Sequence, residues 1–261
     1  MQPLGRAATD EFGRVRFVLT DMDETLTFNG RLGAATYDAL ERLERAGVTV
    51  IPVTAAPAGW CDQMARMWPV DGVIGENGGL HFYRNTNGHG LTRRFWHDES
   101  ARAGVAGELA RIGEEVRAQL PFARFADDQP FRLTSLAFVQ PDGADERAAL
   151  VACLREAGAS TTVNNLWVLG WIGAYDKLVM ARRVLAQSYG LDIDADNEAV
   201  LYVGDSTNDA PMFAFFRQSV GVSTVVEYLH EIPSLPAWIT EGPGGSGFVE
   251  AADAVLRARG G

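Results

Sequence analysis

The sequence has little cysteine, fewer basic than acidic residues, and no long apolar run. Cys61 and Cys153 are too few for a disulfide scaffold and lie in no metal-ligand cluster, so we interpret both as reduced, buried thiols. A formal charge of -11 argues against nucleic acid and acidic membranes as partners, because both need a concentrated basic face. A small anionic substrate is compatible with this charge, since a metal and a few local cations can override it.

No apolar stretch approaches the roughly 18 residues that a membrane span needs. The N-terminal segment carries Arg6, Asp10 and Glu11 and has no apolar core, so we do not expect a secretory signal. We therefore expect a cytoplasmic protein. We also expect it to be a monomer or a homodimer. Its 261 residues, 47% of them apolar, can build one large domain or two smaller ones.

Two acidic residues follow directly after a predicted strand near the N-terminus. Val15, Phe17, Val18 and Leu19 form an apolar run with β-branched and aromatic residues, which predicts a short, largely buried strand. Asp21 and Asp23 then lie on one side of an extended chain, where they repel unless a divalent cation or a shared proton intervenes. These residues alone leave two interpretations open, a ligand site at a strand end or the start of a polar loop.

The next residues continue a strand and helix alternation. The pattern predicts a helix over Ala34–Arg45 and a strand over Val48–Pro52. Such a βαβ unit is right-handed and parallel, so Asp21 and Thr54 are expected at the same edge of a sheet.

This alternation is interrupted between Asn85 and Gly173. The interrupted part predicts, in order, a helix, a strand over Phe131–Val139, a second helix and a hairpin that turns at Asn164-Asn165. Because this order is an α+β pattern, we predict two domains. The predicted parts are an α/β parallel-sheet domain formed by residues 1–84 and 174–261, and an inserted α+β domain formed by residues 85–173.

The alternation resumes after the insertion and again brings polar residues to element ends. Lys177 lies in the first turn of a predicted helix, and the predicted strand Val200–Val203 is followed by GDSTND. That run places Asp205 and Asp209 near a helix N-terminus, which favours anions. A loop of this composition is, taken alone, most often only a loop.

In their order and spacing, these segments resemble the four motifs of the haloacid dehalogenase (HAD) superfamily of phosphohydrolases. The first motif, DxDxT, occurs as Asp21, Asp23 and Thr25, and the most specific piece is GDSTNDAPMF. The resemblance implies a Rossmann-like parallel-sheet core. The insertion is similar to the C2-type cap of subclass IIB, which includes sucrose-phosphate, mannosyl-3-phosphoglycerate and Cof-type phosphatases.

The resemblance implies a role for each matching residue. Asp21 matches the nucleophile that becomes an aspartyl phosphate, and Asp23 matches the acid that protonates the leaving group and then activates water. Thr54 and Lys177 match the groups that hold the phosphoryl oxygens, and Asn208 matches an amide on the phosphate side or the metal side of the site. Lys177 also offsets the repulsion among the acids.

The resemblance also implies a metal site. Asp205 and Asp209 match the acids that hold Mg²⁺, together with a carboxylate oxygen of Asp21 and the backbone carbonyl of Asp23. Octahedral coordination by oxygen with retained waters suits Mg²⁺ better than a softer metal.

The sequence departs from the family pattern at two places. Glu24 stands where the family most often has glycine, and Ala55-Ala56 stands where it often has Gly-Arg. The second departure removes an arginine that helps to bind substrate. We therefore expect the phosphatase chemistry to be kept and the handling of the substrate to differ.

Substrate choice is expected to come from the inserted domain, because the sheet edge contacts only the phosphate. Trp167 and Trp171 are four residues apart, so in a strand they face the same side, either toward a sugar ring or into the core of the cap. Arg132, Asn164 and Asn165 are weaker candidates.

The histidines show no metal-ligand spacing. We interpret His81, His89 and His97 as surface or loop residues.

The sequence therefore predicts a Mg²⁺-dependent phosphatase that acts on a small phosphorylated metabolite, a sugar phosphate or a phosphorylated sugar acid. Two alternatives are a phosphomutase that uses the same aspartyl phosphate and a non-catalytic sugar-phosphate sensor. Closure of the cap over the site is expected to exclude water.

Overall fold

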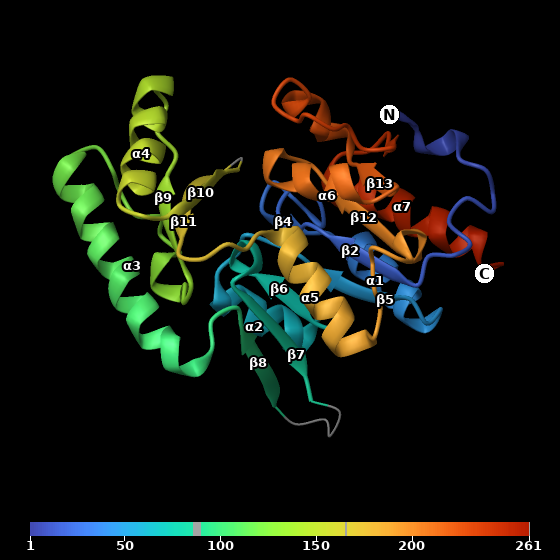
Figure 1. Ribbon diagram of the computed structural model, residues 1–261. Coiled ribbons are helices and arrows are strands. Elements are labelled where there is room, and N and C mark those ends of the chain that lie inside the picture. The colour runs from blue at the N-terminus through green and yellow to red at the C-terminus, as the bar shows by residue number, and fades with distance from the viewer. Residues whose placement is uncertain (86–89, 165, 261) are drawn as a thin grey trace.

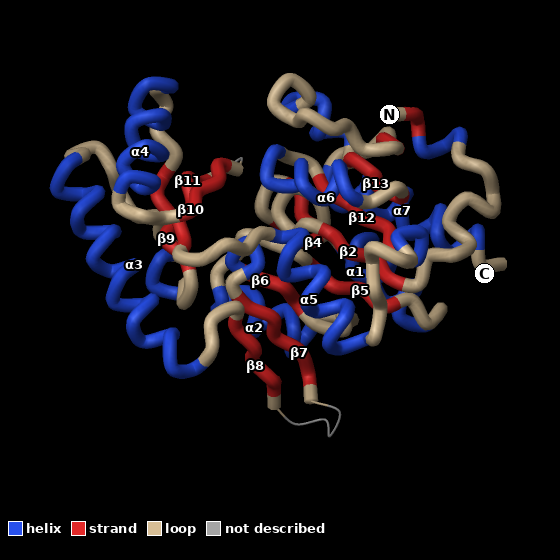
Figure 2. The backbone as a smooth tube through the Cα atoms, viewed as in Figure 1, coloured by secondary structure: helices blue, strands red, loops and turns tan. Residues whose placement is uncertain are grey.

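The computed structural model describes residues 1–85, 90–164 and 166–260, which form a larger and a smaller region side by side (Figure 1). Over these residues, six parallel strands form the sheet at the centre of the larger region (Figure 2). In spatial order they are β1 (Gln2–Pro3), β14 (Trp238–Ile239), β13 (Gln218–Gly221), β12 (Val200–Gly204), β2 (Phe17–Thr20) and β5 (Thr49–Pro52).

Helices cover both faces of this sheet, which is why its strands are apolar on both sides. Val18 and Leu19 are neighbours in β2 and belong to different hydrophobic clusters, one on each face. The cluster around Val18 includes side chains of α1 (Ala34–Arg45), α2 (Ala58–Met67) and α7 (Gly244–Ala258). The cluster around Leu19 includes side chains of α5 (Lys177–Tyr189) and α6 (Ala210–Phe215).

Shorter antiparallel elements extend the larger region. A bridge between Val53 and Ile74 connects the chain after β5 with the next sheet. This sheet consists of β6 (Val73–Gly75), β7 (Leu80–Arg84) and β8 (Leu91–Phe95), and a small hairpin consists of β3 (Thr27–Phe28) and β4 (Arg31–Leu32).

The smaller region is an antiparallel sheet with two helices on one side (Figure 1). It has its own hydrophobic cluster, so it packs as a unit. Its elements are α3 (Glu99–Gln119), β9 (Ser135–Val139), α4 (Ala144–Glu156), β10 (Ser160–Val163) and β11 (Trp167–Trp171).

Two details differ from the sequence-based picture of this region. The strand predicted from Phe131 begins at Ser135, because Gln129–Phe131, with Pro130 in its first turn, forms a short 3-10 helix. The strand β8 lies inside the predicted insertion 85–173 but pairs with β7 of the larger region. The domain boundaries themselves stay a prediction.

Glu76 connects the two regions through a fully buried carboxylate. It lies in the turn after β6, and Oε1 accepts hydrogen bonds from the backbone N–H groups of Ala58 (3.0 Å) and Leu133 (2.8 Å). Oε2 accepts from the N–H and hydroxyl of Thr134 (2.7 and 2.8 Å) and from the hydroxyl of Ser135 (2.8 Å). The carboxylate therefore anchors the segment that leads into β9.

Removing this carboxylate leaves several buried donors without acceptors. We expect Glu76→Ala to lower the free energy of unfolding by about 3 kcal/mol, because each buried donor left unpaired costs about 1–3 kcal/mol before relaxation. Urea unfolding followed by tryptophan fluorescence measures this change. The control is Glu99→Gln, since the Glu99 side chain is 94% exposed. A loss no larger than that of the control would show that Glu76 does not anchor the smaller region.

His81 is buried, so its interpretation as a surface or loop residue was wrong. It lies in β7, is 2% exposed, and its Nε2 atom has no hydrogen-bond partner among the described residues. Burial, with a smaller contribution from the charge of Arg94, lowers the pKa of His81 to about 4. His89 lies outside the described residues, and His97 is a half-buried loop residue whose Nε2 is 2.8 Å from the backbone oxygen of Ile172.

The lowered pKa of His81 predicts a loss of stability in mild acid. The unfolded chain takes up the proton below the ordinary pKa of 6.5, whereas the folded chain does so only near pH 4, so stability falls as the pH falls through this window. At about pH 5 the loss is about 2 kcal/mol. The raised pKa values of Asp21 and Asp23 act in the opposite direction in both proteins, so urea unfolding compares the two. Between about pH 7.5 and pH 5, the free energy of unfolding of the wild type should change less favourably than that of His81→Gln by about 2 kcal/mol. Equal changes in both proteins would contradict the assignment.

Within the described part of the chain, no helix combines the length and the apolar character needed to cross a membrane.

Candidate active site

The acidic residues of the first and last motifs meet at one edge of the parallel sheet. β2 and β12 are neighbours, and Thr20 is paired with Val203 in their register. Asp21 follows β2 directly and donates its N–H to the Val203 oxygen (2.8 Å), while Asp205 follows β12. The carboxyl ends of adjacent parallel strands are where open α/β sheets bind ligands.

Lys177, the only lysine in the sequence, lies between two of these acids. It begins α5 and is fully buried, with Nζ 3.0 Å from Oδ1 of Asp21 and 2.6 Å from Oδ1 of Asp209. Burial alone would lower the pKa of this ammonium group, but the charges of Asp209 and Asp21 outweigh burial and raise it. Lys177 is therefore a fixed positive charge in the site.

The GDSTND loop folds around the carboxylate of Asp209. Oδ2 accepts the backbone N–H groups of Asp205 (2.9 Å) and Ser206 (3.1 Å), and Oδ1 accepts the Tyr202 hydroxyl in addition to Lys177. A Cβ atom at Gly204 would lie 2.5 Å from Oδ2, so glycine is needed for this close approach. With both oxygens engaged, Asp209 acts as the support that holds Lys177 and the loop.

Asp21 and Asp205 each keep one oxygen available. Oδ1 of Asp21 accepts the Met22 N–H (2.8 Å) and Oδ1 of Asp205 accepts the Thr25 hydroxyl (3.0 Å). Within the described residues, Oδ2 of neither acid accepts a hydrogen bond. Burial is the main cause that raises the pKa of Asp21 to about 7 and that of Asp205 well above its usual range.

The acidic cluster fits a divalent metal. One carboxylate oxygen from each of Asp21, Asp205 and Asp209 lies within 4.8 Å of the others. Oxygen ligands of an octahedral Mg²⁺ ion lie about 3–4 Å apart, so the spacing is suitable. Because Asp209 is already engaged, Asp21 and Asp205 are the better direct ligands. The side chain of Asp23 is not part of this cluster, and its predicted contribution was the backbone carbonyl.

The other predicted residues lie around the same edge. Thr54 follows β5, is fully buried, and its hydroxyl oxygen accepts the Ala56 N–H (3.0 Å), which leaves its proton free to donate. Asn208 is buried and its Oδ1 accepts the Ser206 hydroxyl (3.0 Å), while its amide nitrogen donates to none of the described residues. Burial raises the pKa of Asp23 to about 6, although Lys177 partly offsets this effect. That pKa suits a group that gives and takes a proton near neutral pH.

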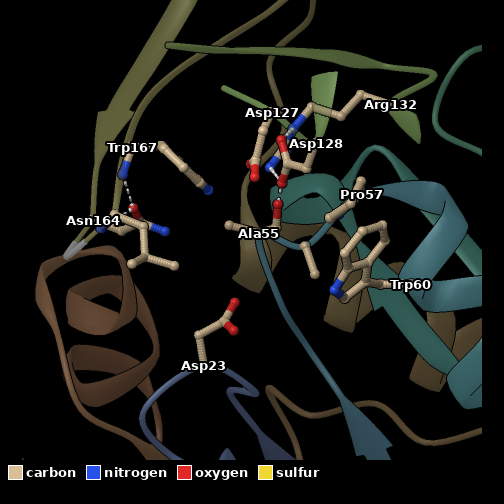
Figure 3. A pocket seen from close by; sticks show the side chains of 11 residues that line it. Asp23, Ala55, Pro57, Trp60, Asp127, Asp128, Arg132, Asn164 and Trp167 are labelled. Carbon is tan, nitrogen blue, oxygen red and sulfur yellow. Dashed lines mark hydrogen bonds and ion pairs between the residues drawn. The ribbon is translucent and has the colours of Figure 1, made fainter. Parts of the chain in front are cut away.

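A cavity of about 140 Å³ lies beside Asp23, between the two regions (Figure 3). Trp167 lines it, whereas Trp171 packs in the apolar cluster between the regions and donates its indole N–H to the Tyr175 oxygen (3.0 Å). Asn165 lies outside the described residues. The lining residues are Asp23, Ala55, Ala56, Pro57, Trp60, Asp127, Asp128, Arg132, Asn164, Leu166 and Trp167.

Three of the lining residues, Trp60, Asp127 and Asp128, were missed in the sequence. Trp60 lies in α2, and the two acids lie in the irregular segment before β9. Trp60 lies in the first turn of α2 but belongs to no motif, and Asp127 and Asp128 precede a short 3-10 helix that the sequence did not indicate. The Asp128 and Arg132 pair, four residues apart, was the one available signal, and it is typical of a helix that does not form there.

The structure gives a physical context to the two departures from the family motifs. Glu24 has a φ of 55°, in the left-handed region where glycine is favoured. This backbone conformation explains why the family most often has glycine at this position. After Thr54, the missing arginine is matched in space by Arg132, which donates from Nη1 to the Ala55 oxygen (2.9 Å). A guanidinium group therefore reaches this place from the other region.

No protein-family model and no curated protein matches the sequence. Solved structures do match it. Protein 0175 of Thermoplasma acidophilum has a TM-score of 0.73 at 18% identity, covering 93% of this chain and 99% of that one. The sucrose-phosphatase of Synechocystis, in complex with sucrose and phosphate, has a TM-score of 0.66 at 15% identity, covering 92% and 97%.

A phosphatase of the haloalkanoate (HAD) enzyme superfamily from Bacteroides thetaiotaomicron gives a TM-score of 0.64 at 17% identity, with 97% of each chain covered. The chain therefore has the fold of HAD phosphatases, a parallel-sheet core with an added smaller region. The resemblance seen in the motifs is confirmed for the fold.

Proposed function

We propose that the protein is a Mg²⁺-dependent phosphatase that hydrolyses a small phosphomonoester, a sugar phosphate or a phosphorylated sugar acid, through an aspartyl phosphate. The observation that carries this proposal is the buried Asp21 carboxylate, whose Oδ1 lies 3.0 Å from the Lys177 ammonium nitrogen and which clusters with Asp205 and Asp209, while Asp23 lines the neighbouring cavity. A binding protein has no need for a desolvated nucleophile and a nearby proton donor together. The similarity of the fold to HAD phosphatases also supports the proposal of a phosphatase.

The residues divide the reaction between them. The Asp21 carboxylate attacks phosphorus and the bond to the leaving oxygen breaks, while Asp23 gives that oxygen a proton. Asp23 then takes a proton from water, which attacks the aspartyl phosphate and releases inorganic phosphate. Lys177, Thr54 and Asn208 orient the phosphoryl oxygens. Mg²⁺, bound by Asp21 and Asp205, would supply further neutralisation of the phosphoryl charge.

The test is release of inorganic phosphate from a panel of sugar phosphates, with Mg²⁺ and with a chelator. We expect release that stops on chelation and returns when Mg²⁺ is restored. Release that is equal with and without metal would contradict the metal site. Conversion of a sugar phosphate to an isomer without net release would identify a mutase, and binding without any turnover would identify a sensor.

The remaining expectations accompany this proposal. We propose that the partner is a small phosphorylated metabolite, that the location is cytoplasmic, and that the protein is a monomer or a homodimer. The formal charge of -11 supports a small substrate over nucleic acid.

A further inference from the structure

The cavity beside Asp23 presents unpaired hydrogen-bond donors and an unpaired acceptor. The carboxylate of Asp127 is exposed and accepts no hydrogen bond from the described residues. The indole N–H groups of Trp60 and Trp167 likewise donate to none of them. Asn164 uses its Oδ1 to accept two backbone N–H groups (2.7 and 3.0 Å), and its amide nitrogen donates to none of the described residues. Figure 3 shows the side chains of these residues turned toward the cavity.

Arg132, the only basic residue among the described residues that line the cavity, is already neutralised. Its Nε and Nη2 atoms donate to the two carboxylate oxygens of Asp128 (2.9 and 2.7 Å) in a bidentate pair. Its Nη1 atom donates to the Ala55 oxygen and to the Ser135 hydroxyl (2.9 and 3.3 Å). The cavity therefore has no cation to spare for a second anion of the substrate, while the Asp127 carboxylate would repel one.

We propose, on the basis of the phosphatase function above, that this cavity takes a leaving group that is uncharged and rich in hydroxyl groups, and that Asp127 determines this selectivity. A hydroxyl group both donates and accepts, so it can donate to Asp127 and accept from the indole and amide N–H groups. A carboxylate cannot donate to Asp127, and an alkyl chain leaves every one of these groups unpaired. The faces of the two indoles also suit the apolar faces of a sugar ring.

This inference narrows the proposed function. A sugar phosphate and a phosphorylated sugar acid were equal candidates from the sequence. The negative charge of Asp127, with no free cation to balance it, disfavours the carboxylate of a sugar acid. The phosphate of a neutral sugar is therefore the substrate class that fits the cavity.

The test compares three six-carbon phosphates that differ at the leaving group: glucose 6-phosphate, 6-phosphogluconate and n-hexyl phosphate. We expect kcat/KM for the glucose ester to exceed that for each of the others by about ten-fold or more. Asp127→Asn should reduce the ratio of kcat/KM for glucose 6-phosphate to kcat/KM for 6-phosphogluconate by about five-fold. The change removes the repulsion between Asp127 and the gluconate carboxylate but keeps the shape of the side chain. Asp142→Asn, an exposed acid of the same region, is the matched control and should leave the ratio unchanged.

Binding measured separately keeps this inference distinct from the phosphatase proposal. Titration calorimetry with Asp21→Asn in Mg²⁺ reports affinity for the same three compounds without turnover. Tighter binding of the glucose ester, with no turnover by the wild type, would support the cavity assignment and overturn the phosphatase. Equal binding and turnover of the glucose and gluconate esters, or an unchanged ratio in Asp127→Asn, would overturn the cavity assignment and leave the phosphatase intact.

Discussion

Replacing Asp21 by asparagine is expected to reduce phosphate release by about 10³-fold or more, because the amide is a poor nucleophile and cannot carry the phosphoryl group. The geometry around the side chain should survive. Oδ1 can still accept from the Met22 N–H and from Lys177. The measurement is kcat for the best sugar phosphate of the panel at saturating Mg²⁺.

A matched control and a folding readout make this result specific. Asp194→Asn changes an exposed acid that is paired only with Arg182 and should keep full activity. Burial raises the pKa of Asp21 from its ordinary 3.8 to about 7, so ionising it in the folded protein costs stability that grows as the pH rises from about 4 to about 7 and is constant above that. Asp21→Asn should therefore unfold at a higher urea concentration than the wild type at about pH 8 in chelator. Activity within ten-fold of the wild type would exclude Asp21 as the nucleophile.

Replacing Lys177 by methionine is expected to reduce both activity and stability. The change keeps the length of the side chain but removes the charge between Asp21 and Asp209, whose Oδ1 atoms lie 3.0 and 2.6 Å from Nζ. Loss of one partner of a buried ion pair costs about 3–5 kcal/mol, because the remaining charges stay desolvated and now repel. Phosphate release should fall by about 10²-fold or more, since the phosphoryl oxygens lose a fixed cation.

The stability change is measured by urea unfolding in chelator, so that added metal does not substitute for the missing charge. Arg182→Gln is the control, because it breaks an exposed ion pair, and such a pair contributes at most about 1 kcal/mol. A Lys177→Met protein as stable as this control would show that Lys177 does not balance the acidic cluster.

The residues of the sheet edge could be predicted because each is tied to a local signal. Asp21, Thr54 and Asp205 follow apolar strands, and Lys177 opens a helix. Parallel strands bring such ends together whatever the details of packing. The close agreement for α1 has the same origin, since Gly33 precedes its first turn and the apolar spacing defines its length.

The cavity could not be predicted, because it exists only where two regions meet. Trp60 comes from α2 and Asp127 from an irregular segment of the smaller region, and no spacing in the sequence relates them. The prediction that His81 is a surface or loop residue was wrong for a related reason. Alternation in β7 points it away from buried Leu80 and Phe82, which normally means solvent, but α5 covers that side through residues such as Met180.

The division of labour among the acids also lay beyond the sequence. Asp205 and Asp209 look alike in GDSTND, and both were expected to hold the metal. In the fold, Asp205 keeps Oδ2 free, whereas the backbone, Tyr202 and Lys177 occupy both oxygens of Asp209. This difference depends on which donors the neighbouring strand and helix supply.

The presence of a single lysine, buried against the Asp21 carboxylate, makes the site visible by spectroscopy. Protein produced with ¹⁵N-labelled lysine would carry one labelled side chain, so its NMR spectrum would contain one ammonium resonance, from Lys177, with no assignment needed. Protons of an ammonium group held by Asp21 and Asp209 exchange slowly with water. The shift of that one signal on adding phosphate or Mg²⁺ would follow binding at the site directly.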